Sequence, residues 1–299
     1  MTELQFTVAT EEDGRQVKQI LRARGVSVRI MNRAKRTEKG ICVNGELVVR
    51  TIDPVEMGNI ITLKLADDTE ILEPMEYNLD IIYEDESLLV INKPPTLAMH
   101  PTHNHQGDSL ANAVTWYLMK QDKTAKFRPV GRLDKGTSGI VVCVLHAFAA
   151  SKLNGTVKKR YFAVVNGCYE GEGTFLNAIY RPKANCTLRA CRTAGEPLQP
   201  GDERAVTHWR ALGHDSEYSA MEIWLETGRT HQIRAHFAHH GTPLAGDDYY
   251  GAPKRETPGH CLHCAEATLI HPVTEQLMRF SAPMPQHMKS LMEPIVNLL

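Results

Sequence analysis

The first 65 residues alternate between amphipathic and extended patterns. In residues 14–38, apolar positions recur at spacings of three and four, which places them on one face of a helix, as at Val17, Ile20 and Leu21. Gly25 interrupts this pattern, so we predict two short helices. Asn44-Gly45 lies between two apolar runs and predicts a hairpin over residues 40–49. The apolar run in residues 58–65 predicts a further strand.

The rest of the chain mixes strand-like and helix-like patterns. A continuous apolar run over residues 140–145 follows a turn-forming segment and predicts a buried strand. Asp108 is a suitable N-cap for a helix over 109–120, and Gly241 is a suitable end for a helix over 229–240. The remaining predicted elements are strands at 79–83, 88–92, 160–165, 220–225, 267–272 and 277–283, a helix at 147–153, and a loop or hairpin insertion at 181–204. This mixture predicts an α+β fold with a mixed, mostly antiparallel central sheet.

A polar, acidic stretch divides the chain into two parts of unequal size. Residues 66–74 are rich in acids and turn-forming side chains, which is typical of a linker between domains. We therefore predict a small α/β domain over residues 12–66, a linker over 67–77 and a large domain over 78–299.

Positive charge is concentrated in the small domain. The whole chain has a formal net charge of -1, yet the segment from Arg15 to Lys39 contains nine cationic side chains and one acid, Glu38. A charged helix face is often merely solvated, but these cations lack the acidic partners at four-residue spacing that such faces usually carry. We therefore predict contact with a nucleic-acid backbone, through the binding residues Arg22, Arg33 and Arg36.

Other compositional features point to the cytoplasm. The seven cysteines are an odd number scattered through a sizeable chain, which favours reduced thiols over a disulfide framework. No segment approaches the roughly 18 uncharged apolar residues that a membrane span requires. The first residues lack the basic start and apolar core of a signal peptide. We therefore expect a cytoplasmic protein without membrane contact.

The turn before the predicted buried strand carries the clearest chemistry. Asp134 lies there between two cations, Arg132 and Lys135. Because a neighbouring cation keeps a carboxylate ionised, Asp134 could act as a nucleophile or as a general base. It could equally be an ordinary turn aspartate whose oxygens accept backbone N–H groups. The residues alone leave both interpretations open.

Three motifs stand in a fixed order along the large domain. They are Arg132-Leu133-Asp134 followed by Thr137-Ser138-Gly139, then Lys159-Arg160-Tyr161, and finally Gly228-Arg229-Thr230-His231-Gln232-Ile233-Arg234. With Asn92-Lys93-Pro94 upstream, they resemble the RluA/RluC/RluD family of RNA pseudouridine synthases over roughly residues 78–285. One departure is Gly131, which stands where the family usually has a histidine. The basic helices, Val-Asn-Gly turn and following strand of residues 12–66 resemble the S-four type of RNA-binding domain.

The resemblance implies a role for each motif. Asp134 would be the catalytic residue, Tyr161 would pack against the target base, and Arg234 would keep the acid ionised. A guanidinium within about 4 to 6 Å typically lowers the pKa of a carboxyl by 1 to 3 units. Arg132 would contact RNA near the extruded base.

The implied reaction is the isomerisation of uridine to pseudouridine in RNA. Uracil leaves its ribose carbon, turns over and rejoins through carbon five, without redox change, so no cofactor is expected. The N-terminal domain places the chain nearer to the branches that modify large-subunit ribosomal RNA. We therefore expect ribosomal RNA as the partner, with transfer RNA as the alternative, and a monomeric chain.

Other functions compete with this interpretation. The chain could be a catalytically inactive RNA-binding protein of the same fold. A glycoside hydrolase would need two facing carboxylates, and nothing in the sequence pairs Asp247 or Asp248 with Asp134. A zinc site could draw on residues 260–264, but these lack a second Cys-x-x-Cys, and His236 and His240 lack the glutamate of a His-Glu-x-x-His motif. We therefore predict no metal.

Overall fold

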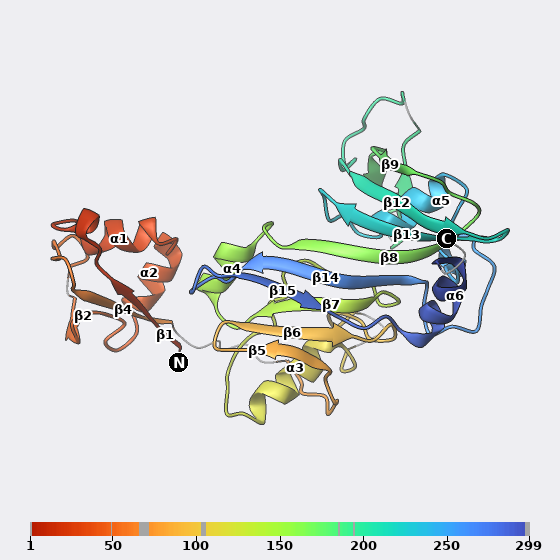
Figure 1. Ribbon diagram of the computed structural model, residues 1–299. Helices are drawn as coiled ribbons and strands as arrows, with labels where there is room; N and C mark the ends of the chain where they lie inside the picture. Colours follow the sequence, from red (N-terminus) through yellow and green to blue (C-terminus); the bar gives the residue numbers. More distant parts are fainter. Residues whose placement is uncertain are drawn as a thin grey trace.

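The structure is a computed structural model that describes residues 2–48, 50–65, 72–102, 106–184, 186–193 and 195–296. A small N-terminal unit lies beside a large unit built on one long sheet (Figure 1). In the small unit, helices pack on a four-stranded sheet with strand order β1-β4-β2-β3. Its elements are β1 (Thr2–Thr7), η1 (Thr10–Glu12), α1 (Val17–Ala23), α2 (Val28–Ala34), β2 (Ile41–Val43), β3 (Glu46–Leu47) and β4 (Ile60–Leu65).

The helices and hairpin predicted for this unit are confirmed. The α2 helix is capped by Ser27, whose Oγ accepts the backbone N–H of Ile30 at 3.3 Å. Asn44 and Gly45 both have positive φ, 50° and 85°, as a two-residue hairpin turn requires. The sequence pattern does not predict β1, because its pairing partner β4 is far away in the chain.

The small unit contacts the large one through the helix α4 (Ala147–Leu153). Phe148 of α4 is buried in the core of the small unit, and its ring meets Phe6 edge-on at 6.1 Å between centroids. Residues 66–71, which include the first five residues of the predicted linker, lie outside the described residues, so the boundaries 12–66, 67–77 and 78–299 stay predictions. The small sheet itself includes β1, which begins before residue 12.

The large unit is organised around a nine-stranded sheet. Its strand order is β5-β6-β7-β14-β8-β13-β12-β9, with β15 paired to β14. Among the described strands of this sheet, β7 and β14 pair in parallel, and the other pairs are antiparallel. The bounds are β5 (Ile81–Glu84), β6 (Leu88–Lys93), β7 (Ser138–Val144), β8 (Lys158–Asn166), β9 (Glu172–Phe175), β12 (Thr207–His214), β13 (Tyr218–Leu225), β14 (Leu262–Ile270) and β15 (Leu277–Ser281). The predicted α+β fold is therefore confirmed.

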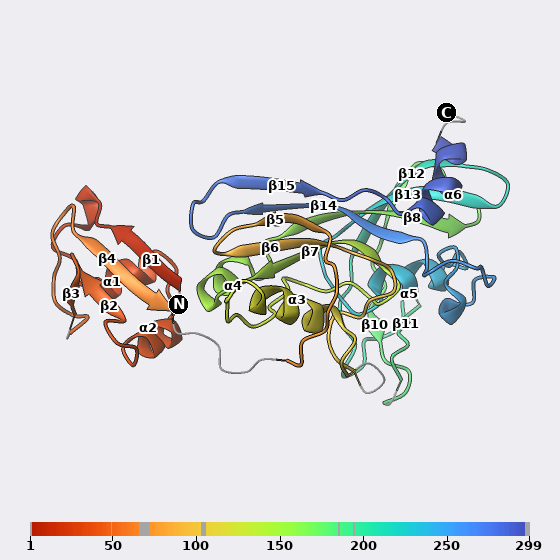
Figure 2. The same cartoon turned by 90° about the horizontal axis from the view of Figure 1, so that it is seen from below.

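Helices cover both faces of the sheet (Figure 2). α3 (Leu110–Met119), α4 and α5 (Gln232–His239) lie on one face, and α6 (Gln286–Val296) lies on the other. Every residue of β7 is buried, as its continuous apolar run predicts. A short pair, β10 (Ile179–Tyr180) and β11 (Ala190–Cys191), and the 3-10 helix η2 (Asp248–Tyr250) lie near α5. Within the described residues, none of the helices combines the length and apolar character that a membrane crossing requires.

Several predicted boundaries are wrong by a few residues. Ser109, not Asp108, caps α3, and its backbone N–H donates to Asn112 Oδ1 at 3.2 Å. The α5 helix starts at Gln232 rather than at residue 229, because His231 has a left-handed backbone that breaks the helical path. The pattern also misses β9, β12 and α6, since β12 is half-buried along most of its length and Pro294 lies inside α6.

Candidate active site

A cleft of about 1020 Å³ opens beside the start of β7. The three sequence motifs supply much of its wall, although they are far apart in the chain. The lining residues include Arg132, Asp134, Tyr161 and Arg234. The structure thus brings together the four residues that the resemblance singles out in the large domain.

Tight packing against β14 fixes the turn that carries Asp134. The backbone N–H of Thr137 donates to the carbonyl of Asp134 at 3.1 Å, and the Thr137 hydroxyl lies 2.8 Å from Nε2 of His260. Gly139 has a φ of +104°, and a Cβ there would lie 2.2 Å from the carbonyl oxygen of Cys264. Only glycine fits this close approach of two backbones, so the path from Asp134 into β7 is rigidly defined.

A buried lysine, Lys93 at the end of β6, anchors the same turn. Its Nζ donates to the carbonyls of Pro94, Leu97 and Lys135 at 2.8, 2.9 and 3.0 Å. The side chain is fully buried, and burial lowers its pKa to about 7. Lys93 thereby joins the segment after β6 to the residue that follows Asp134. The motif Asn92-Lys93-Pro94 was part of the family resemblance, but the sequence alone gave Lys93 no role.

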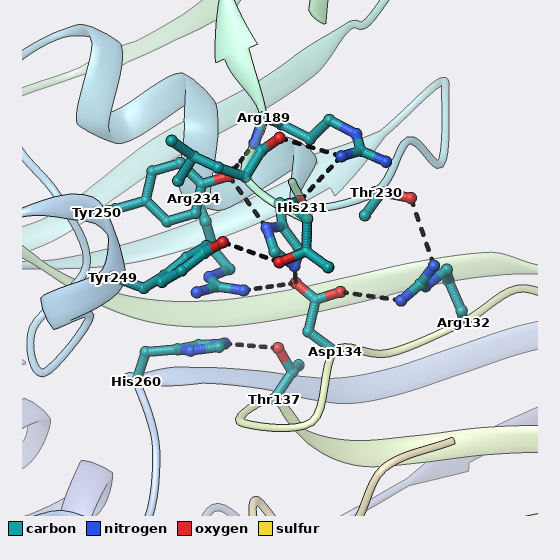
Figure 3. A network of polar contacts seen from close by, with 12 residues as sticks. Arg132, Asp134, Thr137, Arg189, Thr230, His231, Arg234, Tyr249, Tyr250 and His260 are labelled. Atoms are coloured by element: carbon teal, nitrogen blue, oxygen red, sulfur yellow. Dashed lines mark hydrogen bonds and ion pairs between the residues drawn. The ribbon is translucent and has the colours of Figure 1, made fainter. Parts of the chain in front are cut away.

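Arg234 on α5 joins two carboxylates. Its Nη1 donates to Oδ2 of Asp134 at 3.2 Å (Figure 3). Its Nε and Nη2 donate to the two oxygens of Asp247 at 2.7 and 2.8 Å, which is a bidentate pair. Arg234 is 7% exposed and Asp247 is 2% exposed. Asp247 therefore fixes the guanidinium so that one N–H remains directed at Asp134.

The charges around Asp134 favour its ionised form. Burial alone raises the pKa of this carboxyl, but His231, Arg234, His260 and Arg132 lower it more, so the net shift is downward. Burial lowers the pKa of His231 to about 4 and that of His260 to about 3. Both rings are therefore neutral near pH 7 and lower the pKa of Asp134 only in the acid range where they carry a proton, so the permanent positive charge beside Asp134 is that of the arginines.

Tyr161 lies on β8 at the wall of the same cleft. It is 6% exposed, and β8 places it between Ile223 of β13 and Cys264 of β14. Burial raises the pKa of Tyr161 well above its ordinary value, so the phenol keeps its proton. Its neighbours are thus those of a core residue, yet the side chain also borders the cavity that holds Asp134.

The predicted RNA-binding arginines fall into two places. Arg132 is at the cleft, where its Nη2 lies 3.8 Å from Oδ1 of Asp134 and its Nη1 donates to Thr230 Oγ1 at 3.4 Å. Arg22, Arg33 and Arg36 are exposed on the helices of the small unit or just after them, and none of them lines the cleft. Gly131, next to Arg132, has a φ of +76°, which favours glycine there.

The residues considered for zinc serve other contacts. Nδ1 of His263 lies 2.9 Å from Ser138 Oγ, and His236 contacts Thr207 Oγ1 at 2.8 Å. Among the described residues, no three His, Cys, Asp or Glu side chains gather closely enough to hold a metal ion. Asp247, considered for a hydrolase, is bound to Arg234 and is not an unpaired second carboxylate facing Asp134.

The comparisons with known proteins identify the family. The RNA pseudouridylate synthase family matches residues 87–239. The chain is 36% identical over 280 residues to "Uncharacterized RNA pseudouridine synthase YjbO" of Bacillus subtilis, which covers 90% of this chain and 95% of that protein. It is 33% identical over 276 residues to "Ribosomal large subunit pseudouridine synthase D" of Escherichia coli O157:H7, which covers 86% of this chain and 82% of that protein. The chain therefore belongs to the RNA pseudouridine synthases, which confirms the predicted family and enzyme class.

A solved structure shows the same fold. "Human RNA Pseudouridylate Synthase Domain Containing 1" superposes with a TM-score of 0.57 at 24% identity, covering 72% of this chain and 87% of that chain. At this identity the likeness concerns the fold alone. The assignment of the N-terminal unit as an S-four type domain stays a prediction.

Proposed function

We propose that this enzyme converts uridines of large-subunit ribosomal RNA to pseudouridine, with Asp134 as the catalytic residue. The observation that carries the proposal is the pairing of Asp134 with Arg234 in the cleft. The carboxylate is 12% exposed at its side chain, so it is reachable from the cleft yet mostly shielded from water. The choice of RNA is supported by the relative named as a ribosomal large subunit enzyme.

The proposed roles of the other residues follow from their positions. Arg234 keeps Asp134 charged despite burial, and Asp247 holds Arg234 in place. Tyr161 offers a ring at the cleft wall against which the uracil can pack. Arg132, 54% exposed at its side chain and adjacent to the acid, contacts the RNA near the extruded base. The reaction breaks the bond from ring nitrogen one of uracil to the ribose and forms one from carbon five, which loses a proton while nitrogen one gains a proton. No electron is gained or lost, so these side chains need no cofactor.

Contacts outside the cleft must help to hold the RNA. Unstacking a base costs a few kcal/mol, and packing on one aromatic ring returns about 1 to 3 kcal/mol. One tyrosine thus barely compensates for extruding the base. Phosphate contacts by the exposed Arg22, Arg33 and Arg36 would supply the remaining free energy. We accordingly propose that the N-terminal unit is an RNA-binding domain, in a monomeric cytoplasmic enzyme.

The proposal is tested with purified protein and unmodified RNA. Wild-type protein is incubated with large-subunit ribosomal RNA and with transfer RNA, in buffer containing a chelator and no cofactor, and pseudouridines are mapped. We expect conversion at defined uridines of ribosomal RNA, and none with Asp134→Ala. Conversion of transfer RNA alone would overturn the proposal that ribosomal RNA is the substrate. Equal conversion by Asp134→Ala would remove Asp134 from the mechanism, and no conversion by the wild type would favour a silent RNA-binding protein.

A further inference from the structure

Tyr250 and His231 form a hydrogen-bonded pair beside the proposed catalytic acid (Figure 3). The Tyr250 hydroxyl oxygen accepts the backbone N–H of Arg189 at 3.0 Å. The same hydroxyl lies 3.1 Å from Nδ1 of His231. Burial raises the pKa of Tyr250, so its hydroxyl keeps a proton to donate.

The contacts of Tyr250 fix the tautomer of His231. The hydroxyl has one proton, and among its contacts in the described part of the chain only Nδ1 of His231 can accept it. If Nδ1 carried a proton instead, the tyrosine proton would lack a partner, which is costly in a half-buried site. Nδ1 is therefore the acceptor, and the neutral ring carries its proton on Nε2.

The proton on Nε2 lies on the side of the ring that faces Asp134. Nε2 is 3.8 Å from Oδ2 of Asp134, the oxygen that also accepts from Arg234. This separation is longer than a hydrogen bond, but catalytic contacts often tighten only when substrate is bound. We propose that His231 is a positioning residue that directs its Nε2–H at the catalytic carboxylate, and that Tyr250 holds it in that tautomer. The inference rests on the proposed role of Asp134.

The backbone supports this arrangement. His231 has φ 56° and ψ 20° at the N-terminus of α5, a left-handed conformation that is uncommon for non-glycine residues. The conformation turns the chain so that His231 and Arg234 both approach Oδ2 of Asp134. A histidine placed there only to begin the helix would not need to approach Asp134.

The segment that precedes β11 completes the pair. Arg189 supplies the backbone N–H that occupies the Tyr250 oxygen, so the tautomer of His231 depends on the position of this segment. The neighbouring Tyr249 bonds to the same segment through Thr187 Oγ1 at 2.8 Å, but it is 48% exposed, and no hydrogen bond joins it to His231 in the described residues. Tyr249 therefore provides a matched control.

The first test compares Tyr250→Phe with Tyr249→Phe. Both remove one hydroxyl that bonds to the same segment, but only the first frees Nδ1 of His231. In single-site conversion of unmodified ribosomal RNA, we expect Tyr250→Phe to lower kcat about tenfold with KM within about twofold, because one net hydrogen bond is lost. We expect Tyr249→Phe to stay within about twofold of wild type in both constants. Equal values for the two variants would overturn the role of Tyr250.

The second test compares His231→Gln with His231→Met. The two side chains have similar length and suffer the same left-handed strain, but only glutamine can direct an N–H at Asp134. We expect His231→Met to lose about 30-fold in kcat, and His231→Gln to recover most of that loss, because a hydrogen bond to a charged group is at stake. This rescue does not depend on how Tyr250→Phe folds. Equal losses in the two variants would make His231 merely structural.

Asp134→Asn is measured beside these variants to separate the two proposals. If Asp134→Asn is as active as wild type, the proposed function of Asp134 fails and the inference fails with it. If Asp134→Asn is inactive while the glutamine and methionine variants are equal, only the inference about His231 fails.

Discussion

The Asp247→Asn substitution tests whether Arg234 is held in place from behind. Asparagine keeps the shape of aspartate but replaces one acceptor oxygen with an N–H₂ group. At least one of the two bonds to Arg234, at 2.7 and 2.8 Å, is then lost, and two donors face each other. Both residues are nearly inaccessible to water, at 2% and 7% exposure, so solvent cannot replace the lost partner.

The expected cost follows from this burial. Removing one partner of a buried ion pair typically destabilises a protein by about 3 to 5 kcal/mol. Because asparagine retains one acceptor, we expect the lower end, about 3 kcal/mol, which corresponds to a fall in Tm of about 6 to 12 °C for a chain of this size. A displacement of Arg234 by about 1 Å would also lower kcat by about 100-fold. RNA affinity should change little, since Asp247 lies behind Arg234 and is buried.

Thermal unfolding, single-turnover conversion and RNA binding are measured on the same preparations. The control is Asp248→Asn, at the neighbouring exposed acid, which should shift Tm by no more than about 2 °C and leave kcat near wild type. An Asp247→Asn enzyme with wild-type kcat at a temperature where it is folded would refute the reasoning. It would show that Arg234 contacts Asp134 in the active geometry without the bidentate pair to Asp247.

Three further predictions concern other parts of the molecule. In the pH window from about 7 to 10, unfolded Lys93 holds a proton that the folded chain lacks, because burial lowers its folded pKa to about 7, and the neutral amine then keeps two N–H groups for the three carbonyls that it contacts. The free energy of unfolding of the wild type therefore rises by about 2 kcal/mol more from pH 7 to 9 than that of Lys93→Met. If the denaturant midpoints of the two proteins change equally between these pH values, the prediction is contradicted. Replacing Arg22, Arg33 and Arg36 by glutamine should weaken RNA binding and reduce the salt slope by about 0.7 per lost phosphate contact, whereas an unchanged slope would mean that their face is only solvated. Tyr161→Phe keeps the ring against which the uracil packs, so kcat should stay within a few-fold of wild type with unchanged RNA affinity, and a loss of about 100-fold would show that the hydroxyl takes part in proton transfer.

Much of the fold was predictable because the strongest patterns are local. The run Ile140–Leu145 is apolar at every position, and all of β7 is buried. Asn44-Gly45 forms its hairpin because few other residues accept positive φ at both turn positions. The β1 strand was missed because pairing with a distant strand stabilises it, and such pairing leaves no local signature. The β12 strand was missed because it is half-buried along most of its length, so its burial does not alternate clearly.

The site was only partly predictable for a related reason. Asp134, Tyr161 and Arg234 stand in motifs, so resemblance could single them out. Asp247 was considered only as a second hydrolase acid, because its bond to Arg234 spans a turn that the sequence does not describe. The relation of His231 to Asp134 depends on a left-handed backbone that the pattern mistook for helix. Contacts of this kind are set by tertiary packing.

The most direct test of the central claim is a comparison of turnover and binding in Asp134→Asn. Asparagine preserves the shape of the side chain but removes its charge, so binding and chemistry should separate. We predict that the variant binds unmodified ribosomal RNA within about twofold of wild type, since the basic residues that would contact phosphates are unchanged, and forms no detectable pseudouridine in a single turnover. Pseudouridine formation at the wild-type rate would contradict the account.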